Sequence, residues 1–206
     1  MAEKRTHVPL EQRRRELTET AVAVMARDGA WTLTTRAVAK AAGVPHGTVH
    51  YAFSSKNELL REVMRLDLSY LSDLAAAQRE RPVSGADGVR EAVAEMFGAY
   101  AEAVIADPDT ETAYFELSLM AARDAELRAI SAQSHAEYRA VMVTMLEDLA
   151  ERAGLRWGAA PAVDVLAEQL LATVFGAAVS WLEHRDDATF RAVLDDAAEV
   201  LAARLR

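Results

Sequence analysis

Basic side chains are concentrated in one stretch of this 206-residue chain that contains no carboxylate. From Gly29 to Asn57 the sequence has no Asp or Glu, although the whole chain has a formal net charge of −9. The Lys, Arg and His side chains in this stretch are Arg36, Lys40, His46, His50 and Lys56. A polyanion would meet donors and cations there without repulsion, and neutralisation of phosphates supplies most of the non-specific affinity of proteins for DNA. The stretch therefore predicts a DNA-binding surface.

Two short helices joined by a tight turn are expected to position these side chains. Thr34 is a suitable N-cap for the first helix, and Gly43 supplies the left-handed residue that ends it. Pro45 can precede a second helix, because it lacks the N–H group that a first helical turn leaves unpaired. Ser55–Glu58 has the pattern of a capping box for a longer third helix. This order is typical of a helix-turn-helix motif, whose second helix enters the major groove.

Several matched positions in order support this interpretation. They are Leu33-Thr34-Thr35-Arg36, Ala39-Lys40-Ala41-Ala42-Gly43-Val44, Gly47-Thr48-Val49 and Phe53-Ser54-Ser55-Lys56-Asn57-Glu58-Leu59-Leu60. The pattern resembles the DNA-binding signature of TetR-type transcriptional regulators, the tetracycline-repressor family, over about the first third of the chain. The resemblance implies an all-α fold, with an N-terminal three-helix helix-turn-helix DNA-binding domain at 1–55 and a C-terminal helical bundle for ligand binding and dimerisation at 56–206.

The candidate DNA-binding residues are Thr34, Thr35, Arg36, Pro45, His46, Gly47, Thr48, His50, Tyr51 and Lys56. Arg36 carries a planar guanidinium that can bond the N7/O6 edge of guanine. His50 stands where the family commonly has a tyrosine that bonds a phosphate, so either His50 itself or the adjacent Tyr51 is expected to replace that contact. Capping and packing of a small three-helix unit is the alternative role for several of these residues. Further backbone or minor-groove contacts could come from Lys4, Arg5, Arg13, Arg14 and Arg15, and a frayed, solvated terminus is the alternative for them.

Composition agrees with a protein of the cytoplasm. The chain is 51% apolar and has no cysteine, so it has no disulfide or thiolate metal site. No apolar run approaches the roughly 20 residues that span a bilayer, and the charged N-terminus lacks the apolar segment of a signal peptide, so no membrane partner is expected. Residues 1–60 carry a net charge of +3 and residues 61–206 a net charge of −12. We expect nine helices, at about 10–28, 34–42, 46–52, 56–79, 89–106, 108–121, 124–153, 161–184 and 188–205, and essentially no strands.

The last two predicted helices are apolar on more than one face, which indicates burial on more than one side. The family implies a homodimer through a four-helix interface, and small residues at 176–178 would allow close helix approach. The candidate interface residues are Leu166, Leu170, Val174, Ala177, Trp181, Val193, Ala197, Val200 and Leu201. A monomer with a central helix is the alternative. Two identical DNA-binding domains would read two inverted half-sites, so the double-stranded DNA operator should be near-palindromic.

Aromatic and Met residues of the middle helices predict a small-molecule effector site. The candidate ligand-binding residues are Met96, Phe97, Tyr100, Tyr114, Phe115, Glu116, Met120, His135, Tyr138, Met142 and Phe175. Such an adaptable apolar lining with a few polar ends favours a largely apolar or aromatic ligand, although each residue alone is more often ordinary core. In the mechanism that the family implies, the ligand releases a repressor from its operator, and the predicted fourth helix links the two domains.

Other classes of function are less well supported by the sequence. No catalytic residues, cofactor or metal site are predicted, because no segment has a spacing such as H-E-x-x-H or G-x-S-x-G. The chain is therefore not expected to be an enzyme or a metal sensor. A module that binds DNA or another protein without reading sequence remains the main alternative, and a preference of roughly 10³-fold for an operator over random duplex would distinguish a sequence reader from it.

Overall fold

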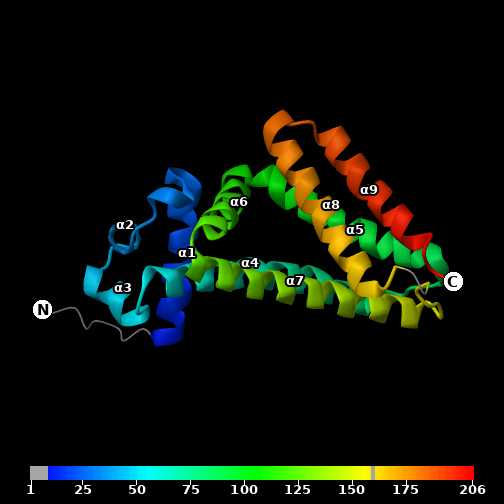
Figure 1. The fold of residues 1–206 in the computed structure, drawn as a ribbon, viewed down its shortest axis with the longest axis horizontal. Coiled ribbons are helices and arrows are strands. Elements are labelled where there is room, and N and C mark those ends of the chain that lie inside the picture. Colours follow the sequence, from blue (N-terminus) through cyan, green and yellow to red (C-terminus); the bar gives the residue numbers. More distant parts are fainter. Residues whose placement is uncertain (1–8, 159–160) are drawn as a thin grey trace, which may run out of the picture. The chain divides into compact units, whose positions relative to one another are not determined.

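The computed structural model describes residues 9–158 and 161–206, and helices dominate them (Figure 1). Within these ranges there are nine α-helices, two short 3-10 helices (η1 and η2) and one isolated β-bridge, which confirms the predicted all-α class. The elements are α1 (Leu10–Asp28), η1 (Ala30–Thr32), α2 (Thr35–Ala41), α3 (His46–Ala52), α4 (Lys56–Ala77), η2 (Gln78–Glu80), α5 (Gly85–Ala106), α6 (Pro108–Arg123), α7 (Ala125–Arg152), α8 (Val163–His184) and α9 (Asp187–Ala202).

The chain forms two compact units, and neither is continuous in sequence. Unit 1 comprises Met1–Asp67 and Asp109–Ser131, and unit 2 comprises Leu68–Pro108 and Ala132–Arg206. The three helices α1–α3, here called the head, share one apolar core with the start of α4, most of α6 and the first turns of α7. Leu117 and Leu127 contribute to that core although they lie far along the chain from α1. Packing therefore joins the head to α6. The boundary at 55/56 between a DNA-binding and a ligand-binding domain stays a prediction about function.

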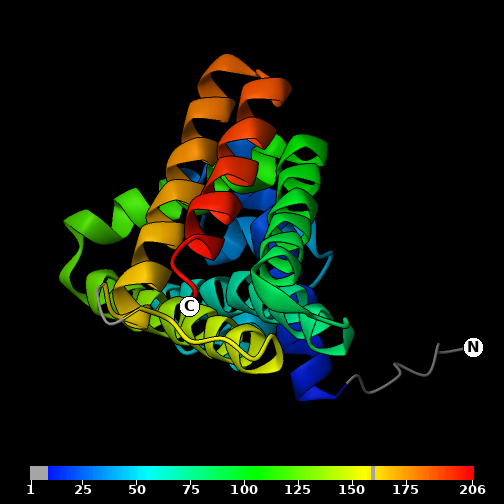
Figure 2. The same cartoon turned by 90° about the vertical axis from the view of Figure 1, so that its right-hand side faces the viewer.

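Three helices, α5, α8 and α9, pack together in unit 2. α9 lies along both α5 and α8, as the red, green and orange helices of Figure 2 show. The buried faces are apolar, with Val93 and Phe97 on α5, Leu170 on α8, and Leu194 and Leu201 on α9. Since apolar area removed from water contributes roughly 25 cal/mol per Å², these faces supply most of what holds the three helices together.

The pair α8 and α9, called the α8–α9 hairpin, is held at both of its ends. At the turn, Asp186 accepts a hydrogen bond of 3.0 Å from the Thr189 backbone N–H, and the Trp181 indole N–H donates to Asp187 at 2.8 Å. At the other end, the backbones of Arg156 and Arg206 exchange two hydrogen bonds of 2.9 Å around the bridge between Trp157 and Leu205. The segment before α8 and the segment after α9 are thereby paired.

The structure corrects two predicted helix ends. The helix expected from 89 begins at Gly85, because Ser84 has the extended backbone of an N-cap residue and its carbonyl accepts the Gly88 N–H at 3.2 Å. The helix expected to reach 205 ends at Ala202, because the residues after it form backbone hydrogen bonds with the segment before α8. In both cases the hydrogen-bond partners of the backbone decide where the helix stops.

One helix has the length and composition of a membrane span, which the sequence analysis did not expect. α8 has 22 residues and a mean hydropathy of 1.6 over its most apolar window, although Glu168 interrupts it. Of that window, 39% is buried against the rest of the chain. A helix that is packed on one side against its own chain and covered on the other by a partner needs the same apolar composition.

Candidate DNA-binding surface, effector region and interface

Local hydrogen bonds define both ends of α2. The Thr34 hydroxyl accepts the Ala37 N–H at 3.1 Å, which confirms Thr34 as the N-cap. Gly43 has a φ of 64°, and the backbone N–H groups of Gly43 and Val44 return to the carbonyls of Lys40 (3.3 Å) and Ala39 (3.0 Å). This pair of bonds is the Schellman motif, which requires the left-handed residue that glycine adopts without strain. The turn between α2 and α3 is therefore specified by its own residues.

A side-chain hydrogen bond joins α2 to α3. The Thr35 hydroxyl lies 3.0 Å from Nε2 of His46, and the His46 ring meets the His50 ring edge-on with centroids 4.3 Å apart. Partial burial, and after it the nearby His50 and Arg36, lowers the pKa of His46. The contact between Thr35 and His46 fixes the two helices against each other. His50 is left exposed one turn later on α3.

The predicted DNA-binding residues divide by exposure into two groups. Arg36, Pro45, Gly47, His50 and Tyr51 are exposed, and the Tyr51 side chain is 78% exposed although it is a large aromatic. Thr35, His46, Thr48 and Lys56 are half-buried, and burial lowers the pKa of Lys56. Thr34 is exposed but its hydroxyl already caps α2. The exposed group therefore has the side chains that are free to meet a ligand outside the head.

The start of α4 is capped by two serines. The Ser55 hydroxyl accepts the Glu58 N–H at 3.1 Å, as the capping-box pattern predicts. The Glu58 carboxylate reaches one residue further than expected, and accepts the backbone N–H and the hydroxyl of Ser54, each at 2.7 Å. These bonds from Ser54, with the Arg14 guanidinium, lower the pKa of Glu58 to about 2. Glu58 is consequently ionised at any physiological pH.

Arg14 has a structural role in the head that the sequence did not predict. It lies at the centre of what we call the Arg14 cluster: its guanidinium bonds Glu58 (2.8 Å), Glu62 (3.1 Å) and the carbonyl of Ala52, and it lies over the Phe53 ring at 4.6 Å. The cluster joins α1 to the end of α3 and the start of α4. The sequence suggested Arg14 either as a DNA contact of a basic arm or as part of a solvated terminus, whereas in the structure its guanidinium bonds groups inside the head.

The other arm residues have local roles or lie outside the described part of the chain. Arg13 pairs with Glu16 at 2.8 Å, and Arg15 pairs with Glu19 at 2.9 Å, both within α1. Lys4 and Arg5 lie outside the described residues. The DNA contact that was suggested for the arm therefore stays a prediction.

The predicted effector residues fall into the two units. Tyr114, Phe115, Glu116 and Met120 belong to unit 1, where Met120 is part of the core that includes the head. The Glu116 carboxylate accepts the Ala30 N–H at 2.6 Å, directly after Gly29. Glu116 thus has a structural partner at the end of α1.

The remaining predicted effector residues lie in unit 2. Met96, Phe97 and Met142 are buried. Tyr138 of α7 meets Phe175 of α8 edge-on with ring centroids 6.0 Å apart, and His135 bonds Glu168 at 2.9 Å across the same two helices. Tyr100 instead meets Phe190 of α9 at 6.5 Å. The ring contact between Tyr138 and Phe175 and the bond between His135 and Glu168 therefore join α7 to α8.

Most of the predicted interface residues are already buried within one chain. Leu166, Leu170, Val174, Trp181, Ala197 and Leu201 are each at most 8% exposed, and Ala177 is half-buried. Val193 and Val200 are 39% and 51% exposed. A different stripe of α8 is exposed, at the helical spacing Val165, Ala172, Gly176 and Val179. A groove of about 400 Å³ between α8 and α9 runs beside it. The burial of the predicted stripe needs no second copy, whereas the exposed stripe lacks a cover in one chain.

Comparison with known proteins agrees with this arrangement. Residues 17–63 match the bacterial regulatory proteins of the tetR family. No protein of curated function matches the chain by sequence. A TetR transcription regulator from Haloarcula marismortui ATCC 43049 has a TM-score of 0.74 and 16% identity, over 95% of this chain and 100% of that chain.

Two regulators named FadR are similar over comparable lengths. The fatty acid degradation regulator FadR from Bacillus halodurans has a TM-score of 0.73 and 17% identity, over 96% of this chain and 97% of that chain. FadR from Bacillus subtilis, solved in complex with stearoyl-CoA, has a TM-score of 0.72 and 17% identity, over 93% and 99%. At these identities the likeness is one of fold, while the family match covers the segment that contains α2 and α3. Residues 17–63 therefore match the DNA-binding segment of the tetR family of bacterial regulatory proteins, and the chain as a whole has a fold similar to that of such regulators.

Proposed function

We propose that this protein is a dimeric, sequence-specific transcriptional regulator of the bacterial cytoplasm, and most simply a repressor that a small molecule releases from DNA. The observation that carries the proposal is the exposed group on α2 and α3, which includes Arg36, His50 and Tyr51 in a stretch without carboxylates. These side chains have donors and aromatic faces directed outward from helices whose geometry is fixed by local bonds. Such an arrangement suits docking of α3 in a major groove.

The exposed residues would have different roles on DNA. Arg36 would bond a guanine edge and so contribute to sequence preference. His50 and Tyr51 would bond phosphates, because both are exposed on α3 and both can donate a hydrogen bond. His46 is half-buried against Thr35, so we expect it to hold α3 in place rather than to read a base.

Dimerisation would place two heads on one operator. We propose that the exposed stripe of α8, together with Val193 and Val200 of α9, forms the interface with a second copy. Ala172 and Gly176 are small enough to let two helices approach closely, and a C2 dimer brings the same patch of both copies together. Half-sites separated by about one turn of DNA, roughly 34–36 Å, or by a multiple of it, would then be read.

A small, largely apolar effector would control this binding. The Bacillus subtilis FadR structure, which shares this fold, holds stearoyl-CoA, and we infer an apolar ligand for this chain also from its aromatic and Met residues. α4 passes from unit 1 into unit 2, so a change in unit 2 has a continuous helix by which to reach the head. By reciprocity the ligand weakens DNA binding by the factor by which DNA weakens ligand binding.

Selection from a random duplex library tests the proposal. The full chain would be incubated with the library at about 0.15 M salt, because affinity measured without stated salt is uninterpretable. Recovery of a near-palindromic consensus, bound roughly 10³-fold or more above random duplex, is the expected result. Enrichment of no sequence, while duplexes are still retained, would instead show a binder of the DNA backbone.

A further inference from the structure

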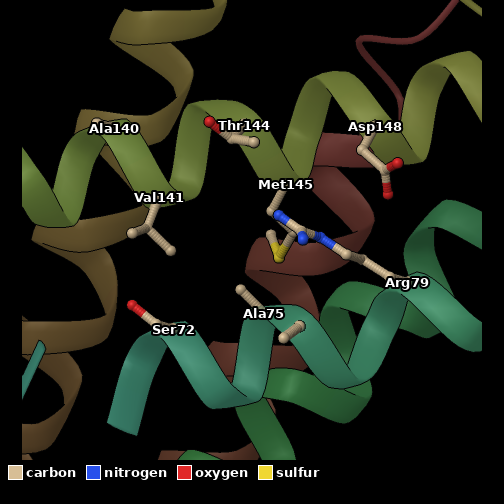
Figure 3. Close-up of a pocket in the computed structure, with 9 residues that line it drawn as sticks. Ser72, Ala75, Arg79, Ala140, Val141, Thr144, Met145 and Asp148 are labelled. Atoms are coloured by element: carbon tan, nitrogen blue, oxygen red, sulfur yellow. The ribbon is translucent and has the colours of Figure 1, made fainter. Parts of the chain in front are cut away.

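A groove in unit 2 lies between the second half of α4 and α7, and it has a volume of about 290 Å³ (Figure 3). Ala75 and Ala76 of α4 form one wall, and Val141 and Met145 of α7 form the other. Met145, one of the Met residues of the middle helices that suggested an effector site, lines it, whereas the aromatic candidates do not. The volume is at the lower end of the range of small-molecule sites, and the apolar walls suit an unbranched hydrocarbon better than a sugar.

The two charged residues of the groove differ in what they already bind. The Asp148 carboxylate is paired with the Arg152 guanidinium, with Nε at 2.9 Å and Nη2 at 2.8 Å from Oδ2. Arg152 also donates to the carbonyls of Gln78 (3.0 Å) and Arg81 (2.8 Å), so it ties α7 to the residues that follow α4. The negative charge of Asp148 is therefore neutralised from outside the groove.

Arg79 has no such partner. Among residues 9–158 and 161–206, no carboxylate forms an ion pair with its guanidinium. Figure 3 shows the Arg79 side chain extending across the groove toward Met145. The groove thus combines apolar walls with one uncompensated positive charge, in a part of the chain, residues 61–206, whose net charge is −12.

We propose that this groove binds a small amphipathic anion, with its hydrocarbon tail between Ala75 and Met145 and its carboxylate at Arg79. The Thr144 hydroxyl, which also lines the groove, is in reach of the same end as a neutral donor. The binding of this anion does not depend on the proposed function. An effect of the bound anion on DNA affinity does rest on the proposed function. Such a ligand would lie beside Arg152, whose bonds hold the end of α4 to α7.

Calorimetric titration of the full chain with octanoate, octanol and octylammonium tests the charge preference, because the three probes share one tail. Octanoate is expected to bind most tightly and octylammonium most weakly. Replacement of Arg79 in R79A should weaken octanoate by about twofold to fivefold, the range for a solvent-screened ion pair, and should leave octanol unchanged. The matched control is R139A, which removes an exposed arginine of α7 that does not line the groove.

Three results would overturn the proposal: equal affinity for octanoate and octanol, equal weakening by R79A and R139A, or no binding of octanoate. A second variant, V141W, fills the groove without a change in charge and should weaken all three probes together. Operator affinity is measured separately on the same proteins. Octanoate that binds through Arg79 but leaves operator affinity unchanged would support the site and contradict its regulatory role, so the two claims fail independently.

Discussion

The helices inside the head and the helices inside unit 2 are held together by different kinds of contact. In the head, polar side chains join one helix to the next: Thr35 bonds His46, and Arg14 bonds groups on α3 and α4. In unit 2, the contacts of α5, α8 and α9 are made mainly by apolar side chains such as Phe97, Leu170 and Leu194. Hydrogen bonds have strict geometry, whereas apolar contacts can repack at modest cost. The difference teaches that directional bonds, added to an apolar core, set how the helices of the head are oriented, whereas α5, α8 and α9 of unit 2 depend mainly on apolar packing.

The largest effect is expected where unit 2 would meet a second copy. Gly176→Glu should raise the dissociation constant of the dimer by at least about 10³-fold, because two like charges would face each other across the two-fold axis. A Cβ at Gly176 meets nothing within 4 Å, so a single chain should tolerate the change. Sedimentation equilibrium gives the measurement. Gly98→Glu on α5, where a Cβ also meets nothing within 4 Å, is the control, and equal dissociation by both variants would place the interface elsewhere.

The next largest effect is expected from the Arg14 cluster. Arg14→Ala should lower the free energy of unfolding of the head by about 2–3 kcal/mol, because it leaves Glu58 and Glu62 without their partly buried cation. Urea unfolding monitored by circular dichroism reports this. Arg15→Ala removes only an exposed pair with Glu19 and should cost less than about 0.5 kcal/mol. Similar losses in both variants would mean that the head is not held by directional contacts.

Arg36 tests whether the exposed surface of the head reads bases. Arg36→Ala should reduce operator affinity by about 1–3 kcal/mol and relax the preference at one base pair in each half-site. Lys40→Ala, at the other end of α2, should weaken operator and random duplex alike. The two variants are compared by fluorescence anisotropy on matched duplexes. Uniform weakening by Arg36→Ala would identify Arg36 as a phosphate contact only.

The smallest predicted effect is a dependence of head stability on pH. The pKa of Glu58 is lowered to about 2 in the folded chain, so its contribution is present above the unfolded pKa and is lost as pH falls through the folded pKa. We expect the free energy of unfolding to fall by about 1–2 kcal/mol between about pH 5 and pH 2, after allowance for solvent screening. Glu58→Gln should flatten this part of the curve, and an unchanged slope in that variant would assign the loss to other carboxyls.

The features of the head that were predictable from sequence are those set by neighbouring residues. Thr34, Gly43 and Ser55 act on residues three or fewer positions away, so residue type and spacing were sufficient. The Arg14 cluster joins residues 38 to 48 positions apart, and Glu116 meets Ala30 across 86 positions. No local pattern contains such pairs, so neither the Arg14 cluster nor the bond from Ala30 to Glu116 could be predicted from the sequence.

Periodicity in unit 2 predicted the helices but not which face of each helix is buried. α8 is apolar on more than one face, so the 3.6-residue period alone does not say which face is buried. The stripe with larger side chains, Leu166, Leu170 and Trp181, is buried within the chain, while the stripe with smaller ones, Ala172 and Gly176, is exposed. Which stripe faces inward depends on where α5 and α9 lie, and that information is in the tertiary packing. The α4–α7 groove was missed for the same reason.

The pairing of Arg156 with Arg206 has a kinetic consequence for assembly. Since the α8–α9 hairpin is held at its turn and at its open end, the face that it presents exists before any partner arrives. In the proposed dimer, two copies would associate as preformed surfaces, at about 10⁵–10⁷ M⁻¹ s⁻¹, without waiting for a segment to fold. Substitutions on that face would then change mainly how long the two copies stay together, and therefore how quickly subunits exchange between dimers.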